Sequence, residues 1–225
     1  MESSLHRQLK DRYATQDAQQ EVRLGDYRID VVTDGMLVEI QHGALAAIRD
    51  KIAELVKHHR LLVVKPIVVR KRIVKFDRRA GTEISRRWSP KRRSSLNLFD
   101  ELVHCTRIFP HRNLTLHVPL VEVEERRYPG HGRRRRRREN DFQVEDVMLV
   151  SVGPVLHVAT ADDLWQMLPS NLPQPFDTGQ LAKQLKVHRA VAQRIAYCMY
   201  HMGAAKRVGK CGNALLYESA VTRSA

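Results

Sequence analysis

Two carboxylic acids and an amide flank a tight-turn signal in the first fifth of the chain. Asp30 precedes the dipeptide Asp34-Gly35, and Glu39 and Gln41 follow it. Asp-Gly between two apolar runs is a strong signal for a two-residue hairpin turn. Such a turn would place Asp30 directly across from Glu39, with Cβ atoms about 5 Å apart. Because side chains alternate between the faces of a strand, Asp30, Glu39 and Gln41 should share one face.

Two like charges at that separation repel each other, and a divalent cation between them would offset the repulsion. Mg²⁺ and Mn²⁺ prefer carboxylate oxygens and water as ligands. A cation held by Asp30 and Glu39 could generate a hydroxide nucleophile and stabilise the transition state of phosphoryl transfer. The alternative is that Arg28 or a nearby lysine neutralises the pair, which would leave an ordinary solvated sheet face.

Hydrophobic periodicity and turn signals predict the elements that would position these side chains. The predicted order is helix, three strands, helix, strand. The ranges are residues 4–14 for the first helix, 21–24, 27–32 and 36–41 for the strands, 44–59 for the second helix and 61–69 for the last strand. The predicted core face of the hairpin is formed by Ile29, Val31, Val38 and Ile40.

In this order of elements, Ile29-Asp30 followed by Glu39-Ile40-Gln41 resembles the PD-(D/E)XK nuclease superfamily. The resemblance implies an α/β (α+β) fold in which helices flank a mixed central sheet. It also implies that Asp30 and Glu39 bind Mg²⁺ and that the protein cleaves DNA phosphodiesters. Many superfamily members carry a further acid on the first helix, and Glu2 stands at the matching position, where it can equally be a helix-start residue.

The chain departs from the superfamily at the third position of the motif. Superfamily members have a lysine two residues after the glutamate, whereas this chain has Gln41. A neutral amide can orient a water molecule by hydrogen bonds but cannot act as a general base. Lys65 could replace the missing lysine, but the neighbouring Pro66 predicts an edge or a bulge, with Lys65 facing solvent.

The middle of the chain is strongly basic. Residues 70–93 are rich in arginine and lysine, and they include Trp88, which could stack on a base or pack within the fold. A helix is predicted at 96–109 and strands at 114–124 and 143–152. Between these strands lie six arginines that would contact a DNA backbone, with RNA or protein contact as the alternative. They are Arg133, Arg134, Arg135, Arg136, Arg137 and Arg138.

Three prolines predict a linker at 169–176, between a nuclease-like domain (1–168) and a C-terminal domain (177–225). In the C-terminal domain, two helices are followed by two strands around a glycine-rich turn. The predicted ranges are 180–185 and 188–202 for the helices and 204–208 and 214–218 for the strands.

This helix-turn-helix with a hairpin resembles a winged helix, in which the second helix enters a DNA major groove. Arg189, Gln193 and Arg194 would then reach bases or phosphates, and Lys210 would hold the DNA backbone at the wing. Winged helices also serve as protein-interaction modules, and that alternative stays open.

The overall charge favours a polyanionic partner. The 225 residues contain 39 Lys and Arg against 25 Asp and Glu, for a net charge of +14. DNA is the first candidate partner and RNA the second. No signal peptide is recognised in the polar segment 1–10, and no stretch reaches the roughly 18 apolar residues of a spanning helix. The sequence therefore predicts a cytoplasmic protein without a membrane partner.

These features lead to a ranked set of hypotheses. A metal-dependent nuclease that acts on DNA comes first. A catalytically inactive DNA-binding or regulatory protein on a degenerate nuclease fold is the alternative, and Gln41 supports it. An RNA-binding or RNA-processing factor is the third, for which the arginine run suffices. No GxxxxGK[ST] phosphate-binding loop is present, so ATP use is not supported.

Overall fold

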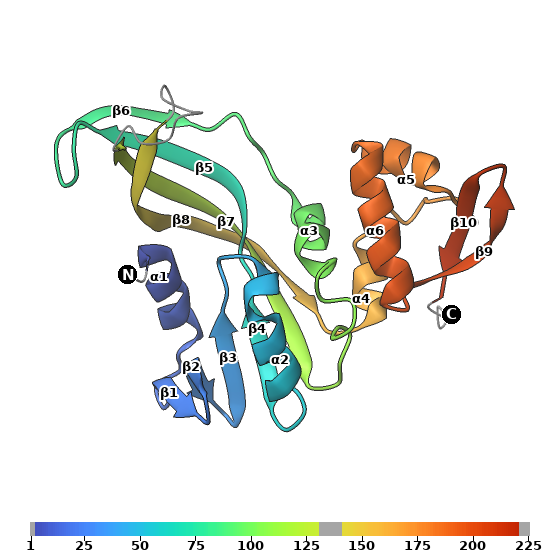
Figure 1. Ribbon diagram of the computed structural model, residues 1–225, viewed down its shortest axis with the longest axis horizontal. Coiled ribbons are helices and arrows are strands. Elements are labelled where there is room, and N and C mark those ends of the chain that lie inside the picture. The colour runs from blue at the N-terminus through green and yellow to red at the C-terminus, as the bar shows by residue number, and fades with distance from the viewer. Residues whose placement is uncertain (1–2, 131–140, 221–225) are drawn as a thin grey trace.

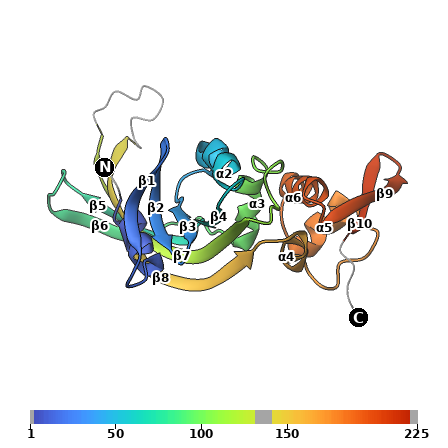
Figure 2. The same ribbon diagram turned by 90° about the horizontal axis from the view of Figure 1, so that it is seen from below.

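In the computed structural model, residues 3–130 and 141–220 are described. Glu2 and the arginines at 133–138 lie outside these residues. The described chain forms a mixed eight-stranded sheet flanked by helices, followed by three helices and a two-stranded sheet at one end of the molecule (Figures 1 and 2). The predicted mixed α/β architecture with a central sheet is therefore confirmed.

The first part of the chain follows the predicted order of elements. The Asp34-Gly35 hairpin has the predicted register, since Val31 lies opposite Val38 and Thr33 lies opposite Met36. The elements are α1 (Ser4–Tyr13), β1 (Gln19–Leu24), β2 (Tyr27–Thr33), β3 (Met36–Ile40), the 3-10 helix η1 (Leu45–Ile48), α2 (Arg49–Leu55) and β4 (Arg60–Val64). The predicted helix at 44–59 was too long, because residues 56–59 form the turn that returns the chain to β4.

The predicted strand at 61–69 is two strands that meet at Lys65-Pro66. β4 and β5 (Ile67–Phe76) both run parallel to β7 (Leu114–Pro129) along the same edge, with Leu61 beside Leu114 and Ile67 beside Leu120. The outer neighbour changes from β3 before the break to β6 (Glu83–Trp88) after it. Pro66 lacks an N–H, so it separates the two pairings.

Strands β7 and β8 (Phe142–Val158) extend beyond their predicted ranges and form one long antiparallel pair. The β7 strand, with β5 and β6, projects beyond the first part of the sheet as an arm (Figure 1). The predicted helix at 96–109 was wrong, since only η2 (Ser95–Leu98) and α3 (Phe99–Leu102) are helical. Turns after α3 place Cys105 and Phe109 in the core. These two residues are four positions apart, which is also the spacing of buried residues on one face of a helix.

Two hydrophobic clusters hold these elements together. One cluster joins Leu5 and Leu9 of α1 to Val31, Val38 and neighbouring strand residues. The other contains Ile29, and it joins α2 and α3 to the sheet and continues into the C-terminal helices. All four residues of the predicted hairpin core face are buried, but Ile29 belongs to the second cluster rather than to the first.

The C-terminal part has the predicted order of helix, turn, helix and hairpin. Its elements are α4 (Ala161–Gln166), α5 (Thr178–Leu185), α6 (Arg189–His201), β9 (Ala205–Cys211) and β10 (Ala214–Ser219). Asp177 begins α5 by accepting hydrogen bonds from the N–H groups of Gly179 and Gln180. Lys186, in the left-handed conformation with φ +53°, ends it. No helix of the described residues is long and apolar enough to cross a membrane.

The proline-rich segment 169–176 is packed rather than loose. Leu172 and Phe176 are buried, and Phe176 exchanges two backbone hydrogen bonds with Tyr217 of β10. The main cluster also contains Leu102 of α3 and Met199 of α6, so the sheet and the C-terminal helices share one continuous core.

Leu9→Ala should lower the free energy of unfolding by about 2–5 kcal/mol, because Leu9 is 1% exposed and fills the contact between α1 and the sheet. Urea denaturation followed by circular dichroism measures this change. Asp11→Ala, at an exposed position of the same helix, is the control and should change stability by less than about 0.5 kcal/mol. A loss below about 1 kcal/mol for Leu9→Ala would contradict the described packing of α1.

The shared core predicts that the sheet and the C-terminal helices unfold together. Differential scanning calorimetry should give one transition whose calorimetric and van't Hoff enthalpies agree. Phe176→Ala should lower the midpoint of that single transition, because Phe176 is 1% exposed in the shared core. Two separate transitions in the unmodified protein would show instead that the C-terminal elements form an independent folding unit.

Candidate functional site

The β2–β3 ladder ends at the Val31–Val38 pair, and Asp30 on β2 and Glu39 on β3 are the residues directly beyond that pair. Oδ2 of Asp30 accepts a hydrogen bond of 2.7 Å from the N–H of Ile40, the residue after Glu39. The two carboxylates are close enough that the charge of Asp30 raises the pKa of Glu39. The sequence analysis expected Asp30 directly opposite Glu39 on one face, but the ladder does not include this pair, and Asp30 contacts His6 of α1 whereas Glu39 contacts Lys51 of α2.

Glu39 is buried, and one of its carboxylate oxygens pairs with a lysine. Oε1 lies 2.6 Å from Nζ of Lys51, whereas Oε2 is buried and lacks a close hydrogen bond within the described part of the chain. Burial raises the pKa of Glu39 above its usual value; the Lys51 ammonium and the backbone N–H of Asp30 oppose this effect, and the Asp30 charge adds to it. A buried oxygen without a partner is costly, so this atom is a place where a cation or a water molecule would bind favourably.

Asp30 has a different electrostatic environment from Glu39. Its Oδ1 lies 3.2 Å from Nε2 of His6 on α1. Burial acts to raise the pKa of Asp30, but hydrogen bonds from His6 and from the Ile40 amide, with the charges of His6 and Lys51, lower it below its usual value. Asp30 is therefore held as a carboxylate, and its two oxygens are fixed by two different elements.

Lys51 is the site residue that sequence reasoning missed. It lies on α2 and donates to Oε1 of Glu39 at 2.6 Å and to the carbonyl oxygen of Arg28 at 2.5 Å. Its side chain is only 15% exposed. The sequence offered one weak signal, since Lys51 stands beside Ile52 on a predicted helix that directly follows the hairpin. Only the packing of α2 against the sheet places it on the carboxylate.

Gln41 and Lys65 both make their hydrogen bonds away from the acid pair. The side-chain N–H of Gln41 donates to the carbonyl oxygen of Ala44 at 2.7 Å. Lys65 is 3% exposed, so the prediction that it faces solvent was wrong. Its Nζ lies 3.2 Å from Oε1 of Glu101 and also contacts the Gly43 carbonyl, because the chain turns inward at the end of β4. Burial lowers the pKa of Lys65, which Glu101 partly opposes.

The described residues contain no group of three or more His, Cys, Asp or Glu side chains placed to hold a metal ion. Asp30 and Glu39 would therefore supply two protein ligands, and water would complete the shell of a cation such as Mg²⁺. The predicted third acid, Glu2, lies outside the described residues. The orphaned Oε2 of Glu39 and the hard oxygen donors fit a hard divalent cation.

The predicted nucleic-acid contacts are separated in the structure. Arg133 to Arg138 lie outside the described residues. Arg189 and Gln193 are exposed on α6, and Lys210 is exposed on β9. Arg194, by contrast, contacts Asp100 of α3, so its guanidinium connects the C-terminal helices to the sheet.

Comparisons with known proteins place the chain in a family. Residues 3–158 match the family model described as "Domain of unknown function (DUF8091)". The match ends at the last residue of β8, so it covers the sheet and the helices interleaved with its strands.

A second comparison found a relative of the chain. An uncharacterized protein of Treponema pallidum (strain Nichols) is 31% identical over 183 residues, which cover 81% of this chain and 72% of that protein. No solved structure gives a significant match. On the strength of the family match, which spans more than half of its residues, the chain belongs to the DUF8091 family.

Proposed function

We propose that this protein is a metal-dependent nuclease that cleaves DNA phosphodiesters, with Asp30 and Glu39 as the metal ligands. The observation that carries the proposal is the pair of adjacent carboxylates, one of which has a buried oxygen without a partner. A protein that only needed a stable sheet would gain from a neutral residue at this position, since burying a carboxylate is costly.

A Mg²⁺ or Mn²⁺ ion bound by Asp30 and Glu39 would supply a nucleophilic hydroxide near neutral pH and stabilise charge on the phosphoryl group. The protein's own part is to hold two carboxylates in a fixed arrangement. His6 and the Ile40 amide fix Asp30, and Lys51 fixes Glu39. Such outer contacts orient metal ligands and tune their basicity.

Lys51 supplies the positive charge that the resemblance to PD-(D/E)XK nucleases would place at position 41. Its Nζ lies on Glu39, so the ammonium also stands within reach of a phosphate at the acid pair. Gln41 instead donates to Ala44 and holds the turn that leads into η1. We therefore assign charge stabilisation to Lys51 and the position of the 41–44 turn to Gln41.

DNA would be held by basic residues outside the acid pair. Arg189, Gln193 and Lys210 are exposed on α6 and β9, where a winged helix would meet a duplex, and the arginines at 133–138 would add contacts to phosphates. The net charge of +14 supports a polyanionic substrate.

A second candidate function is DNA binding without catalysis. Glu39 is ion-paired with Lys51 and Asp30 with His6, and these pairs could complete the site without a cation. Gln41 at the lysine position agrees with this alternative. It predicts salt-dependent DNA binding and no cleavage with either cation.

Asp30→Asn and Glu39→Gln should each lower the rate of DNA cleavage more than about 100-fold, because each removes a proposed metal ligand. The measurement is release of acid-soluble label from DNA with Mg²⁺ or Mn²⁺. Asp34→Asn is the matched control, since Asp34 is an exposed acid on the turn of the same hairpin and should keep full activity. Cleavage at the normal rate by either site variant would overturn the site assignment.

Lys51→Met should lower kcat by roughly 10–100-fold, because it removes the ion-pair partner of Glu39. KM should change less, because the proposed DNA contacts outside the acid pair are kept. Lys51→Arg keeps the charge and should recover part of the rate, although a planar guanidinium differs from an ammonium in shape. Lys57→Met, on an exposed lysine of the following turn, is the control. Equal kcat values for the Met variant and the unmodified protein would exclude this role for Lys51.

A further inference from the structure

The arm formed by β5, β6 and β7 carries different charges on its two faces. Residues of β5 alternate, so Lys71 and Lys75 project from one face and Arg70 and Arg72 from the other. Lys75 lies directly beside Arg127 of β7. We name the first surface the basic face; its members are Lys71, Lys75, Arg87, Lys91, Arg93 and Arg127.

The opposite face of the arm is neutralised by acids of β7. Glu124, which is buried, pairs with Arg72, Arg86 and Arg126. The basic face has far less compensation, because only Lys71 and Arg127 among its described residues reach a carboxylate, that of the buried Glu125.

The remaining cations of the basic face are exposed and uncompensated. Within residues 3–130 and 141–220, no acidic side chain forms an ion pair with Lys75, Arg87, Lys91 or Arg93. Lys75 and Arg127 therefore form a like-charged neighbouring pair, and a single buried carboxylate serves both Arg127 and Lys71. Such a surface is favourable for an anion that brings its own negative charge.

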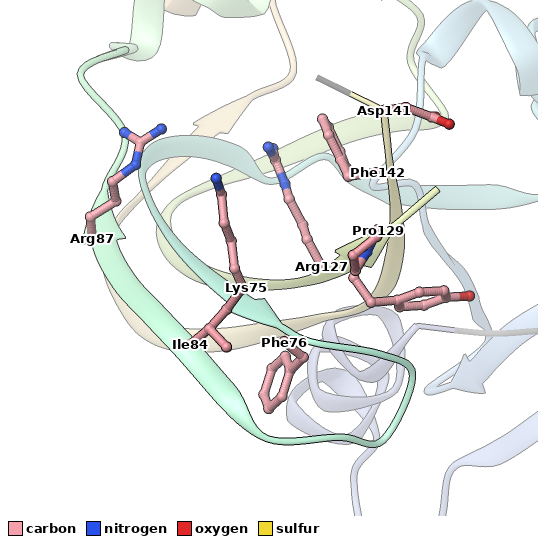
Figure 3. Close-up of a pocket in the computed structure, with 9 residues that line it drawn as sticks. Lys75, Phe76, Ile84, Arg87, Arg127, Pro129, Asp141 and Phe142 are labelled. Atoms are coloured by element: carbon pink, nitrogen blue, oxygen red, sulfur yellow. The ribbon is translucent and has the colours of Figure 1, made fainter. Parts of the chain in front are cut away.

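An aromatic pocket opens on the basic face at the far end of the arm. It has a volume of about 230 Å³, and Phe142 is the aromatic ring that lies beside Arg127 in it. Phe76 and Tyr128 also line the pocket, but strand alternation directs their side chains toward the neutralised face, where Arg126 lies over the Phe76 ring. Figure 3 shows Lys75 and Arg127 extending side by side from neighbouring strands, with Phe142 beside Arg127. The Arg127 guanidinium lies 3.8 Å from the centre of the Phe142 ring. The pocket is smaller than the roughly 300–1,000 Å³ typical of sites for drug-sized ligands, so it suits one flat group.

A second pocket of about 400 Å³ continues from the first toward the acid pair. Lys71, Lys91 and Arg93 line it, and Arg127 lines both pockets. Arg93 stands near enough to Lys65 for its charge to lower the Lys65 pKa.

From this end of the basic face, short contacts lead to the candidate site. Nζ of Lys65 lies 3.5 Å from the carbonyl oxygen of His42, and the ring centres of His42 and His6 are 6.0 Å apart. His6 contacts Asp30. The end of the basic face at Arg93 is thus linked to Asp30 through the buried Lys65 and the His42 and His6 rings.

We propose that the basic face binds single-stranded nucleic acid, with one base in the aromatic pocket and the adjoining phosphates on Lys75, Arg87 and the cations of the second pocket. This inference rests on the proposed nuclease function, and it specifies that the substrate of the Asp30–Glu39 site is a single strand. Aromatic side chains beside a basic groove bind single strands because an unstacked base presents its ring face. In a duplex the bases are stacked and cannot enter such a pocket.

The composition of the pocket favours nucleic acid over an acidic peptide. Carboxylates would need the cations alone, whereas the Phe142 ring offers an apolar surface that an acidic side chain does not use. Asp141 is the acidic residue among the described pocket residues, and its carboxylate points away from Lys75 and Arg127 (Figure 3).

The test is binding of fluorescein-labelled oligonucleotides to the full chain in EDTA, followed by anisotropy. Without a divalent cation there is no cleavage, so the result does not depend on the nuclease activity. A dT strand of about 20 residues should bind at least about tenfold more tightly than a duplex of the same length at equal salt. The matching U strand tests whether the sugar matters, and polyglutamate serves as the competing acidic peptide.

Two sets of variants locate the bound strand. Lys75→Gln with Arg87→Gln should weaken dT binding at least about tenfold and reduce the salt slope by about 0.7 for each phosphate that is no longer neutralised. Arg23→Gln with Arg107→Gln removes the same charge from positions outside the basic face and should change affinity less than about twofold. Phe142→Leu removes the ring beside Arg127 and should weaken dT binding at least about fivefold while leaving heparin binding unchanged. Phe76→Leu removes a ring of the opposite face and should change dT binding less than about twofold.

The outcomes separate the binding face from the proposed function. Weaker dT binding by the charge double variant and by Phe142→Leu, with no cleavage activity in the unmodified protein, would support the binding face and contradict the nuclease proposal. Duplex binding as tight as dT binding, equal competition by polyglutamate, or normal dT binding by Phe142→Leu would overturn the single-strand proposal. If Phe142→Leu fails to fold, as judged by its unfolding midpoint, the charge double variant and the comparison of dT with duplex decide.

Discussion

Burial of the Glu39 carboxylate next to that of Asp30 is the constraint around which the first part of this fold is arranged. Removing a charge from water costs several kcal/mol even in real proteins, and a like charge alongside adds to that cost. Glu39 is 8% exposed, so water screens its charge poorly and a positive charge close by is needed to stabilise it. Lys51 provides it, and the crossover through η1 and α2 brings that lysine over the hairpin. One oxygen of Glu39 remains without a partner among the described residues despite this arrangement, which is typical of a site shaped for a ligand rather than for stability.

The long strand β7 connects this site to the rest of the sheet. Its first residues pair with β4, which lies next to β3 and Glu39, and its later residues pair with β5 in the arm. Because the chain breaks at Lys65-Pro66, β4 and β5 can pair one after the other with the same edge of β7. β7 is therefore the strand that joins the arm to the part of the sheet that carries Glu39.

Local signals were sufficient for the hairpin and insufficient for its surroundings. Asp34-Gly35 specifies a turn through its own backbone requirements, so the Val31–Val38 register followed from the sequence. The helix predicted at 96–109 was wrong because Cys105 and Phe109 reach the core from turns, and burial alone does not reveal which backbone delivers a side chain. Lys51 was missed for the same physical reason: it is twelve residues from Glu39, and only tertiary packing joins them. Lys65 was expected in solvent because its partner Glu101 is distant in sequence.

The distribution of charge matters more than the net value of +14. Many arginines of the arm are structural, since Glu122 and Glu124 of β7 neutralise those on one face. Trp88 belongs to that neutralised face, where the Arg70 guanidinium lies 4.1 Å from its ring centre and covers one face of the ring. The basic face is different because its exposed cations lack such partners among the described residues and adjoin an aromatic pocket. Glu122 and Glu124 thus neutralise the arginines on one face of the arm. The opposite face keeps its positive charge, and it is the surface that would attract a polyanion.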